Sequence, residues 1–168
     1  MVYLIGYMGA GKTTISKLLA NELHLPFYDT DQEIEKKEKR SISDIFKKDG
    51  ELHFRKLETE LLENISQNSI IACGGGLPIH NNNMRLINSK GISIYLKASN
   101  NYLFSRLKNE KINRPLIANK TDKELEVYIT KNLQNRNPFY NLAHHCILID
   151  NKSTDEVLRE VNALIRPV

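Results

Sequence analysis

Short apolar runs alternate with amphipathic stretches along the chain. Five runs have the length of a β-strand, at residues 2–5, 26–28, 69–73, 92–96 and 146–149. The runs at 69–73 and 146–149 are continuously apolar, which is typical of strands buried on both faces of a sheet. The alternation predicts an α/β fold in which one five-stranded parallel sheet is flanked by helices.

Apolar residues recur at helical spacing between and after these runs. They form four sets: Ile15, Leu18, Leu19 and Leu23; Leu57, Leu61, Leu62 and Ile65; Leu103 and Leu107; and Val157, Leu158, Val161, Leu164 and Ile165. Capping-box patterns predict three helix starts, at Thr30 with Glu33, Thr121 with Glu124 and Ser153 with Glu156. The polar segment 108–120 shows no period, and we expect a mobile loop there.

The composition is that of a folded soluble domain, with 168 residues, 40% of them apolar and 26% charged. A chain of this size can form one core without a disulfide or a structural metal. Cys73 and Cys146 match no zinc or redox spacing, so we expect buried thiols in a reducing compartment. No apolar run approaches the roughly 20 residues that span a bilayer, and no secretory signal precedes residues 2–5. We therefore expect a cytoplasmic protein with no membrane partner.

The net charge of +4 and the pI near 9.0 leave nucleic acid, acidic lipid and small anions open as partners. The densest basic stretch, residues 36–40, is interrupted by Glu38. Glu33 and Glu35 stand four residues before Lys37 and Lys39, which favours a solvated, salt-bridged helix face over a nucleic-acid surface. We expect no nucleic-acid partner and a monomeric chain.

Residues 6–13 read Gly-Tyr-Met-Gly-Ala-Gly-Lys-Thr and fit the pattern G-x-x-x-x-G-K-[ST] between an apolar run and an amphipathic stretch. Glycines let successive amides point inward, and the following helix adds the positive end of its dipole, so the loop can hold a polyphosphate. Lys12 would bring a charge to the β- and γ-phosphates, and Thr13 a hydroxyl to the accompanying Mg²⁺. The alternative is a glycine-rich turn without a ligand.

Further motifs follow this P-loop along nearly the whole chain. The full series is Gly6-Tyr7-Met8-Gly9-Ala10-Gly11-Lys12, Tyr28-Asp29-Thr30-Asp31, Phe54-Arg55-x-x-Glu58, Gly74-Gly75-Gly76, Arg114-Pro115-Leu116 and Arg136-x-x-x-Tyr140. In content and order it resembles the motif series of the shikimate kinases. The resemblance implies the nucleoside-monophosphate-kinase type of fold, with strand order 2-3-1-4-5. It also implies one kinase domain, 1–168, with a substrate-binding region at about 30–62 and a closing lid at about 108–121.

By this resemblance the chain transfers the γ-phosphoryl group of ATP to the 3-hydroxyl of shikimate, giving shikimate 3-phosphate and ADP in chorismate and aromatic amino-acid biosynthesis. ATP and Mg²⁺ are the implied cofactors and shikimate is the implied partner. The implied nucleotide-binding residues are Gly9, Ala10, Gly11, Lys12, Thr13, Thr14, Arg106 and Arg114. Thr13 stands where the family commonly has serine, a change that keeps the hydroxyl. Adenine contacts would fall around residues 150–154.

Asp29 and Asp31 follow the second predicted strand, where the loops of a parallel sheet face the ligand crevice. The resemblance implies that Asp29 and Thr13 hold Mg²⁺. It also implies that Asp31 is catalytic together with Lys12, and that Asp31 orients the substrate hydroxyl or accepts its proton. From its position alone, Asp31 could equally complement the dipole of a helix.

Three arginines are assigned by the same resemblance. Arg55 and Arg136 match positions that fork onto the shikimate carboxylate, a bidentate geometry that lysine does not reproduce. Arg114 matches the lid arginine that compensates charge during transfer, which makes it the third implied catalytic residue. Taken singly, each of the three could be a surface or loop arginine.

Three glycines after a buried strand, Gly74, Gly75 and Gly76, indicate either backbone that passes close to another group or a flexible turn. The resemblance implies that they border the substrate. It implies as well that Phe46 and Phe54 line the pocket, although core packing is an alternative for Phe46.

Two other functions remain open at this point. A kinase of similar architecture could act on gluconate or on a nucleoside monophosphate, although a nucleotide acceptor would require base-reading contacts. A nucleotide-binding module without catalysis would keep the P-loop but could lose Asp31, Arg55 and Arg136. Assays with a panel of acceptors separate these possibilities.

Overall fold

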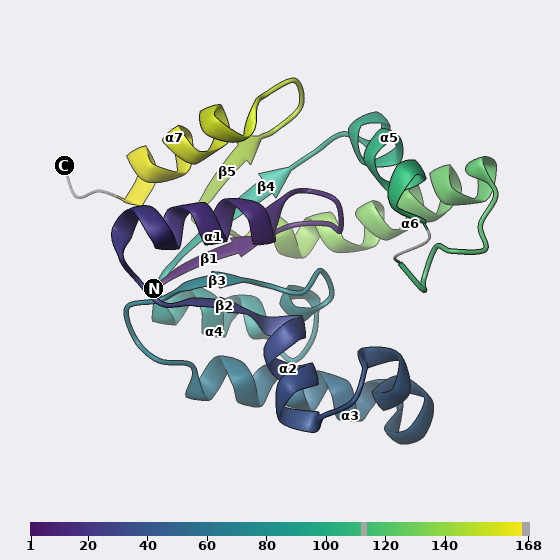
Figure 1. Cartoon of the computed structure of the whole chain (residues 1–168), viewed down its shortest axis with the longest axis horizontal. Coiled ribbons are helices and arrows are strands. Elements are labelled where there is room, and N and C mark those ends of the chain that lie inside the picture. The colour runs from purple at the N-terminus through teal and green to yellow at the C-terminus, as the bar shows by residue number, and fades with distance from the viewer. Residues whose placement is uncertain (112–113, 166–168) are drawn as a thin grey trace.

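The computed structural model describes residues 1–111 and 114–165. Its elements, with η1 a 3-10 turn, are β1 (Val2–Ile5), α1 (Lys12–Leu23), β2 (Phe27–Asp29), α2 (Thr30–Glu38), α3 (Ile42–Asn64), β3 (Ile70–Ala72), η1 (Leu77–Ile79), α4 (Asn83–Lys90), β4 (Ile92–Lys97), α5 (Asn100–Glu110), α6 (Asp122–Tyr140), β5 (His145–Leu148) and α7 (Thr154–Ile165). The predicted alternation of strands and helices is confirmed, with strand ends that differ from the expected ones by at most one residue (Figure 1).

The five strands form one parallel sheet in the order β2-β3-β1-β4-β5, which confirms the expected fold. The central strand β1 pairs with β3 and β4, so that Tyr3 lies opposite Ile71 on one side and Ser93 on the other. All four residues of β1 are buried. Because every strand is parallel, all the carboxyl ends meet at one edge of the sheet, where ligands of such folds bind.

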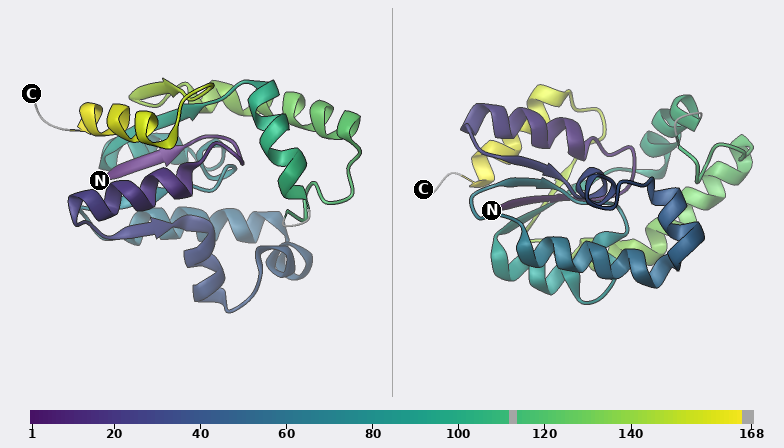
Figure 2. Two further views of the ribbon diagram at one scale, coloured as in Figure 1. Left: turned by 45° about the horizontal axis from the view of Figure 1, so that its top comes forward. Right: turned by 60° about the horizontal axis from the view of Figure 1, so that its bottom comes forward.

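Helices cover both faces of the sheet. α1 and α7 pack on one face, while α3, α4 and α6 lie on the other (Figure 2). α2 and the first part of α3 project beyond the carboxyl edge on one side of the P-loop, and α5 with the start of α6 does so on the other (Figure 1). A small separate core of Ile34, Ile45, Phe54 and Leu57 joins α2 to α3. Within the described ranges, no helix is long and apolar enough to cross a membrane.

The prediction that residues 146–149 are buried on both faces is wrong for two of the four residues, since Ile149 is buried like Ile147. β5 is one of the two edge strands of the sheet, and the alternation of exposed and buried residues along it shows that one of its faces meets solvent. Ile147 is buried, whereas Cys146 and Leu148 are exposed. Cys73 is buried as expected, so only one of the two thiols fits the prediction.

The segment 108–120 is not a single loop. α5 continues to Glu110, and a series of turns at 115–119 packs Ile117 fully into the main core. Lys111 ties the two ends of the segment together, because its Nζ donates to Lys120 O at 2.9 Å and to Asp122 Oδ1 at 2.7 Å. The expected mobility of this segment falls in part on residues 112–113, which lie outside the described residues.

The cap of α2 differs from the predicted one. Asp29, not Thr30, is the N-cap, because Asp29 Oδ1 accepts from the amides of Asp31 at 3.1 Å and Gln32 at 3.4 Å. Thr30 Oγ1 instead accepts from the amide of Gly74 at 2.8 Å, which joins the start of α2 to the end of β3. The other two predicted capping boxes are formed, at Thr121 with Glu124 and Ser153 with Glu156.

The basic stretch 36–40 is salt-bridged as expected, but with other partners. Lys37 pairs with Glu60 of α3 at 3.5 Å, and Arg40 pairs with Glu38 at 2.8 Å and Asp49 at 2.6 Å. These ion pairs connect α2 and its C-terminal turn to α3. The helix ends too early for the predicted pair of Glu35 with Lys39, since Lys39 has already left the helical conformation, and Lys37 pairs with Glu60 instead of Glu33.

Candidate active site

The P-loop connects β1 to α1 at the carboxyl edge of the sheet. Gly11 has a left-handed φ of 81° directly before α1, a conformation that any other residue adopts only with strain. Lys12 Nζ donates to Tyr7 O at 2.9 Å, across the loop. Burial lowers the pKa of Lys12 to about 8, although the charges of Asp31 and Asp29 oppose that shift. The loop therefore combines inward-facing backbone with a cation, as a polyphosphate site requires.

Thr13 and Asp29 bring two oxygen ligands together beside the loop. Thr13 Oγ1 donates to Asp29 Oδ2 at 2.8 Å, while Asp29 Oδ1 caps α2 and is thereby fixed. A hydroxyl and a carboxylate are ligand types that Mg²⁺ accepts alongside phosphate oxygens and water. The donor set at the two predicted metal-binding residues therefore fits Mg²⁺.

Asp31 lies in the first turn of α2 and lines the same cavity as Lys12 and Asp29. Burial raises the pKa of Asp31 to about 6, and the negative charge of Asp29 adds to the shift while Lys12 opposes it. A carboxylate of raised pKa beside a phosphate site can take a proton from a hydroxyl group. Its alternative role as a helix-dipole partner does not explain this burial.

The glycine triplet, residues 74–76, faces three predicted substrate-binding side chains. A Cβ added to the first glycine would collide with Asp31 Oδ1. One on the second would lie 3.1 Å from Arg136 Nη1, and one on the third 2.6 Å from Arg55 Nη1. None of the three has a positive φ, so close approach rather than backbone strain accounts for the glycines. The triplet thus brings Asp31, Arg55 and Arg136 to one place.

Arg55, on α3, is held by two carboxylates. Its Nη1 lies 2.8 Å from Glu58 Oε2, while its Nε and Nη2 lie 3.1 Å and 2.8 Å from Glu51 Oε1. The rings of Phe46 and Phe54 lie 5.8 Å and 5.4 Å from its Cζ. Nη1 and Nη2 both face the third glycine of the triplet, so this edge of the guanidinium is directed at the predicted substrate pocket.

Glu58 is the buried member of this group. Its side chain is only 1% exposed, and burial raises its pKa to about 7 although the charge of Arg55 opposes the shift. Phe46 is half-buried and packs against the α2–α3 core, so it serves both as core and as a neighbour of Arg55.

Arg136, on α6, has a different environment. Its Cζ lies 5.2 Å from the centre of the Tyr7 ring, which belongs to the P-loop. Within residues 1–111 and 114–165 it makes no ion pair with a carboxylate. One turn later, Tyr140 OH donates to Gly75 O at 2.6 Å and so fastens α6 to the triplet. Arg136 therefore presents its charge without a protein counterion.

Arg106 and Arg114 reach the phosphate side of the site. Both line a cavity of about 220 Å³ that also contains Lys12 and the first two glycines of the triplet. Arg114 Nε and Nη2 donate to Glu110 Oε2 at 2.9 Å and 2.6 Å, and Arg106 Nη1 donates to Tyr102 OH at 2.9 Å. The structure therefore places both predicted arginines beside the P-loop.

A narrower groove leads from the P-loop toward α7. Tyr102, Ile149, Lys152 and Thr154 line it together with Thr14 of the P-loop helix. It includes part of the 150–154 region expected to meet adenine. The Tyr102 ring and the Ile149 side chain are apolar surfaces of the kind on which a base can rest.

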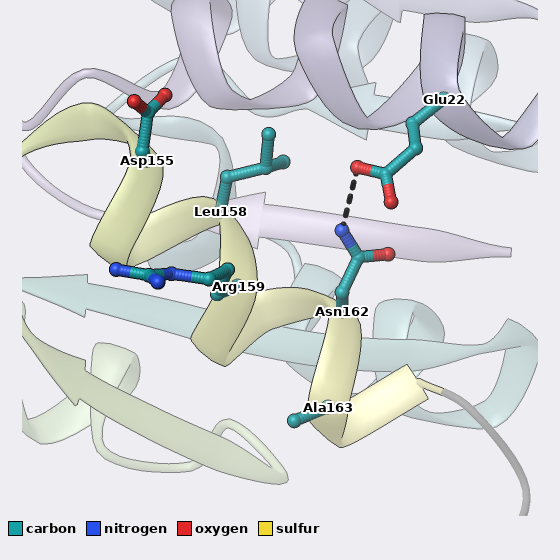
Figure 3. A pocket seen from close by; sticks show the side chains of 6 residues that line it. All are labelled: Glu22, Asp155, Leu158, Arg159, Asn162 and Ala163. Carbon is teal, nitrogen blue, oxygen red and sulfur yellow. Dashed lines mark hydrogen bonds between the residues drawn. The ribbon is translucent and has the colours of Figure 1, made fainter.

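A larger cavity, of about 320 Å³, lies between α1 and α7 (Figure 3). Asn162 Nδ2 donates there to Glu22 Oε2 at 2.9 Å, and Asp155, Leu158 and Arg159 complete most of the lining. None of the predicted site residues borders it. We place the site at the smaller P-loop cavity because the phosphate loop, the two aspartates and the glycine triplet meet only there.

Some residues around the site have no role in the sequence prediction. Glu51 and Glu58 stand four residues before and three residues after Arg55, a helical spacing that could have revealed them as its partners. Tyr7 and Arg136 lie far apart in the chain, and no local pattern indicates their contact.

The parallel sheet, the P-loop and the two arginines beside the glycine triplet define the class as a P-loop kinase of a small molecule. Within that class, the chain belongs to the shikimate kinase family, whose model matches residues 8–166. It is therefore an ATP-dependent kinase.

Relatives and solved structures agree with this assignment. The shikimate kinase of Flavobacterium johnsoniae is 43% identical over 95% of both chains. The crystal structure of shikimate kinase from Bacteroides thetaiotaomicron superposes with a TM-score of 0.89 at 34% identity, covering 98% of this chain and 97% of that one. Shikimate kinase from Acinetobacter baumannii in complex with shikimate gives a TM-score of 0.87 at 34% identity, with coverages of 98% and 91%.

Proposed function

We propose that this chain transfers the γ-phosphoryl group of ATP to the 3-hydroxyl of shikimate in the cavity between the P-loop and the glycine triplet. The observation that carries the proposal is the convergence of Asp31, Arg55 and Arg136 on the three glycines, across from Lys12. A hydroxy-acid acceptor needs this combination of one carboxylate for the hydroxyl and two arginines for the anion.

The nucleotide would bind along the P-loop, with its phosphates against the amides of Gly9, Ala10 and Gly11 and its base toward the Tyr102 groove. Lys12 and Thr14 lie at the start of α1, where the helix dipole adds to the attraction for phosphate. Thr13 and Asp29 would hold Mg²⁺, Asp29 through water, and when bound the ion neutralises phosphate charge.

The acceptor would bind across from the phosphates. Arg55 and Arg136 grip its carboxylate, the triplet amides border its ring, and Phe46 and Phe54 form the apolar side of the pocket. Asp31 then lies next to the hydroxyl that reacts. Fixing both ends of the acceptor brings that hydroxyl oxygen in line with the γ-phosphorus, which is the main contribution an enzyme makes to phosphoryl transfer.

In the transfer step, the 3-hydroxyl oxygen forms a bond to the γ-phosphorus while the bond from that phosphorus to the β–γ bridging oxygen breaks. The hydroxyl proton passes to Asp31, and ADP leaves with the electron pair of the broken bond. Lys12 and Arg114 compensate the charge that builds up on the phosphoryl oxygens. In this mechanism Arg114 exchanges its present partner, Glu110, for phosphate as the lid at 108–121 closes.

The experiment is an assay of ADP release with ATP, Mg²⁺ and shikimate, run beside gluconate and nucleoside monophosphates as acceptors. We expect ADP to form in amounts equal to shikimate 3-phosphate and only with shikimate. Equal turnover with another acceptor, or none with shikimate, would contradict the proposal.

The same proposal includes a monomer that acts in the cytoplasm without a nucleic-acid or membrane partner. Its support is that all the groups named above come from one chain. Light scattering at assay concentration should give the mass of one chain, 19.3 kDa. A concentration-dependent dimer whose dissociation abolishes turnover would contradict it.

A further inference from the structure

The two arginines of the acceptor pocket are held in place by different means. Arg55 has two carboxylate partners, which together offset its charge, whereas Arg136 has none among the described residues. Arg136 therefore supplies most of the net positive charge to which an anion would be attracted. The group that fixes its guanidinium is then decisive for acceptor affinity.

We infer that Tyr7 is a positioning residue that holds Arg136 in place for the acceptor carboxylate. The inference rests on the proposed function, because it concerns the same pocket. The face of the Tyr7 ring lies 5.2 Å from Arg136 Cζ, and the tyrosine is only 1% exposed. A cation over a buried aromatic face is attracted more strongly than over an exposed one.

An aromatic ring suits this task better than a carboxylate. A carboxylate would take up N–H donors of the guanidinium and cancel its charge, as Glu51 and Glu58 do in part for Arg55. The ring attracts the cation through its π face and takes up none of its N–H donors, one of which faces the Tyr140 hydroxyl. The environment of Arg136 thus combines fixed position with an intact charge.

The backbone of Tyr7 is itself held firmly. Its carbonyl accepts from Lys12 Nζ at 2.9 Å and from the amide of Ala10 at 3.2 Å. A Cβ added at Gly75, close to Arg136 Nη1, would also lie 3.6 Å from Gly6 O and 3.7 Å from Met8 N, on either side of the tyrosine. The P-loop therefore forms one side of the acceptor pocket, and the Tyr7 ring is the part of the P-loop that contacts Arg136.

The ring, rather than the hydroxyl, is the part of Tyr7 that this role uses. Tyr7 OH is buried and has no hydrogen-bond partner among the described residues. Replacement by phenylalanine keeps the ring, and replacement by leucine removes it. Comparing the two substitutions therefore separates the effect of the π contact from any effect of the hydroxyl.

We expect Tyr7→Leu to raise the KM for shikimate about tenfold, as loss of a buried cation–π contact implies, with kcat and the KM for ATP within about twofold of the wild type. Tyr7→Phe should restore the KM for shikimate. The control is Tyr3→Leu, which removes an equally buried tyrosine of β1 that stacks on no arginine among the described residues. The KM of this variant for shikimate should not change.

A double-mutant cycle tests whether Tyr7 affects shikimate binding through Arg136. In an Arg136→Met background, Tyr7→Leu should add nothing to the KM for shikimate, because the ring then has no cation to hold. An undiminished tenfold effect in that background would overturn the inference. If Tyr7→Leu fails to fold, phenylalanines carrying increasing numbers of fluorine atoms at position 7 weaken the π face at nearly constant shape, and the KM should rise with each added fluorine.

The outcomes also separate this inference from the proposed function. If the wild type shows no shikimate-dependent ADP release, the proposed function fails and this inference with it. If the wild type is active but the KM for shikimate stays unchanged in Tyr7→Leu, or across the fluorinated series, only the role of Tyr7 is overturned.

Discussion

The cavity beside the P-loop has a phosphate side and an acceptor side, and the two are built in different ways. The centre of the phosphate side comes from one continuous segment, in which backbone amides, Lys12 and Thr13 follow each other within a few residues, and Arg106 and Arg114 complete it. The acceptor side is assembled from side chains of α2, α3 and α6 around a glycine triplet after β3.

This difference sets what a substitution can do on each side. A change at the phosphate side acts directly on the group being transferred, so it should reduce the rate. A change at the acceptor side acts on how one small molecule is held, so most such changes should alter KM. Asp31 belongs to both sides, since it faces Lys12 as well as the triplet, and Tyr7 of the P-loop also contacts the acceptor side through Arg136.

Lys12→Ala should have the largest effect. It removes the cation that faces the transferring phosphoryl group, and we expect kcat to fall about 10³-fold while the protein stays folded. ADP release should fall by this factor. Shikimate should still bind, as measured by calorimetry. Loss of shikimate binding in this variant would show that the two sides are not separate.

Arg136→Ala should raise the KM for shikimate about 10²-fold, because it removes a charged hydrogen-bonding partner of the carboxylate. Binding of ATP should change little. Arg85→Ala is a matched control, since Arg85 is exposed on α4 and away from the cavity. An equal loss of ATP affinity in Arg136→Ala would count against its placement on the acceptor side.

Two substitutions in the triplet should sharpen the comparison further. In Gly74→Ala the new methyl group displaces Asp31, so kcat should fall about tenfold. In Gly76→Ala it displaces the guanidinium of Arg55, so mainly the KM for shikimate should rise, also about tenfold. Steady-state kinetics of both variants check this, and the same kinetic change in both would mean that the triplet moves as a unit.

Glu58 should give the smallest effect, on stability rather than rate. Its pKa is about 7 in the folded protein against an ordinary value of 4.5, so the folded state holds the proton more tightly than the unfolded state. The stability this adds is fully present below about pH 4.5 and is lost as the pH rises through about 7.

Urea unfolding of the wild type and Glu58→Gln at pH 5 and pH 8 measures the effect. Glutamine can still accept from Arg55 but does not titrate, so the variant should gain stability relative to the wild type between the two pH values. A difference that does not vary with pH would contradict the raised pKa of Glu58.

The strand order and the P-loop could be predicted because they follow from ordered motifs and local patterns, and the same motifs supplied the residues that lie together around the P-loop and the glycine triplet. The sequence did not predict features that depend on distant neighbours. The exposure of Cys146 follows from the edge position of β5, and Asp29 replaces Thr30 as a cap because Gly74 recruits the threonine hydroxyl. The Tyr7–Arg136 contact likewise exists only once α6 has packed beside the P-loop.

The buried side chain of Ile117 has a consequence for how the cavity opens and shuts. Full burial of an isoleucine side chain contributes about 1.5–3 kcal/mol to stability. Separating the 115–119 turns from the rest of the protein would therefore cost about that much free energy. This loss is avoided if α5 and the start of α6 rotate as a unit and the 115–119 turns move together with them. Arg114 would then move over the phosphates together with the 115–119 turns as one rigid unit, and the amide of Ile117, which donates to Arg114 O at 3.0 Å, would stay protected from exchange throughout the cycle.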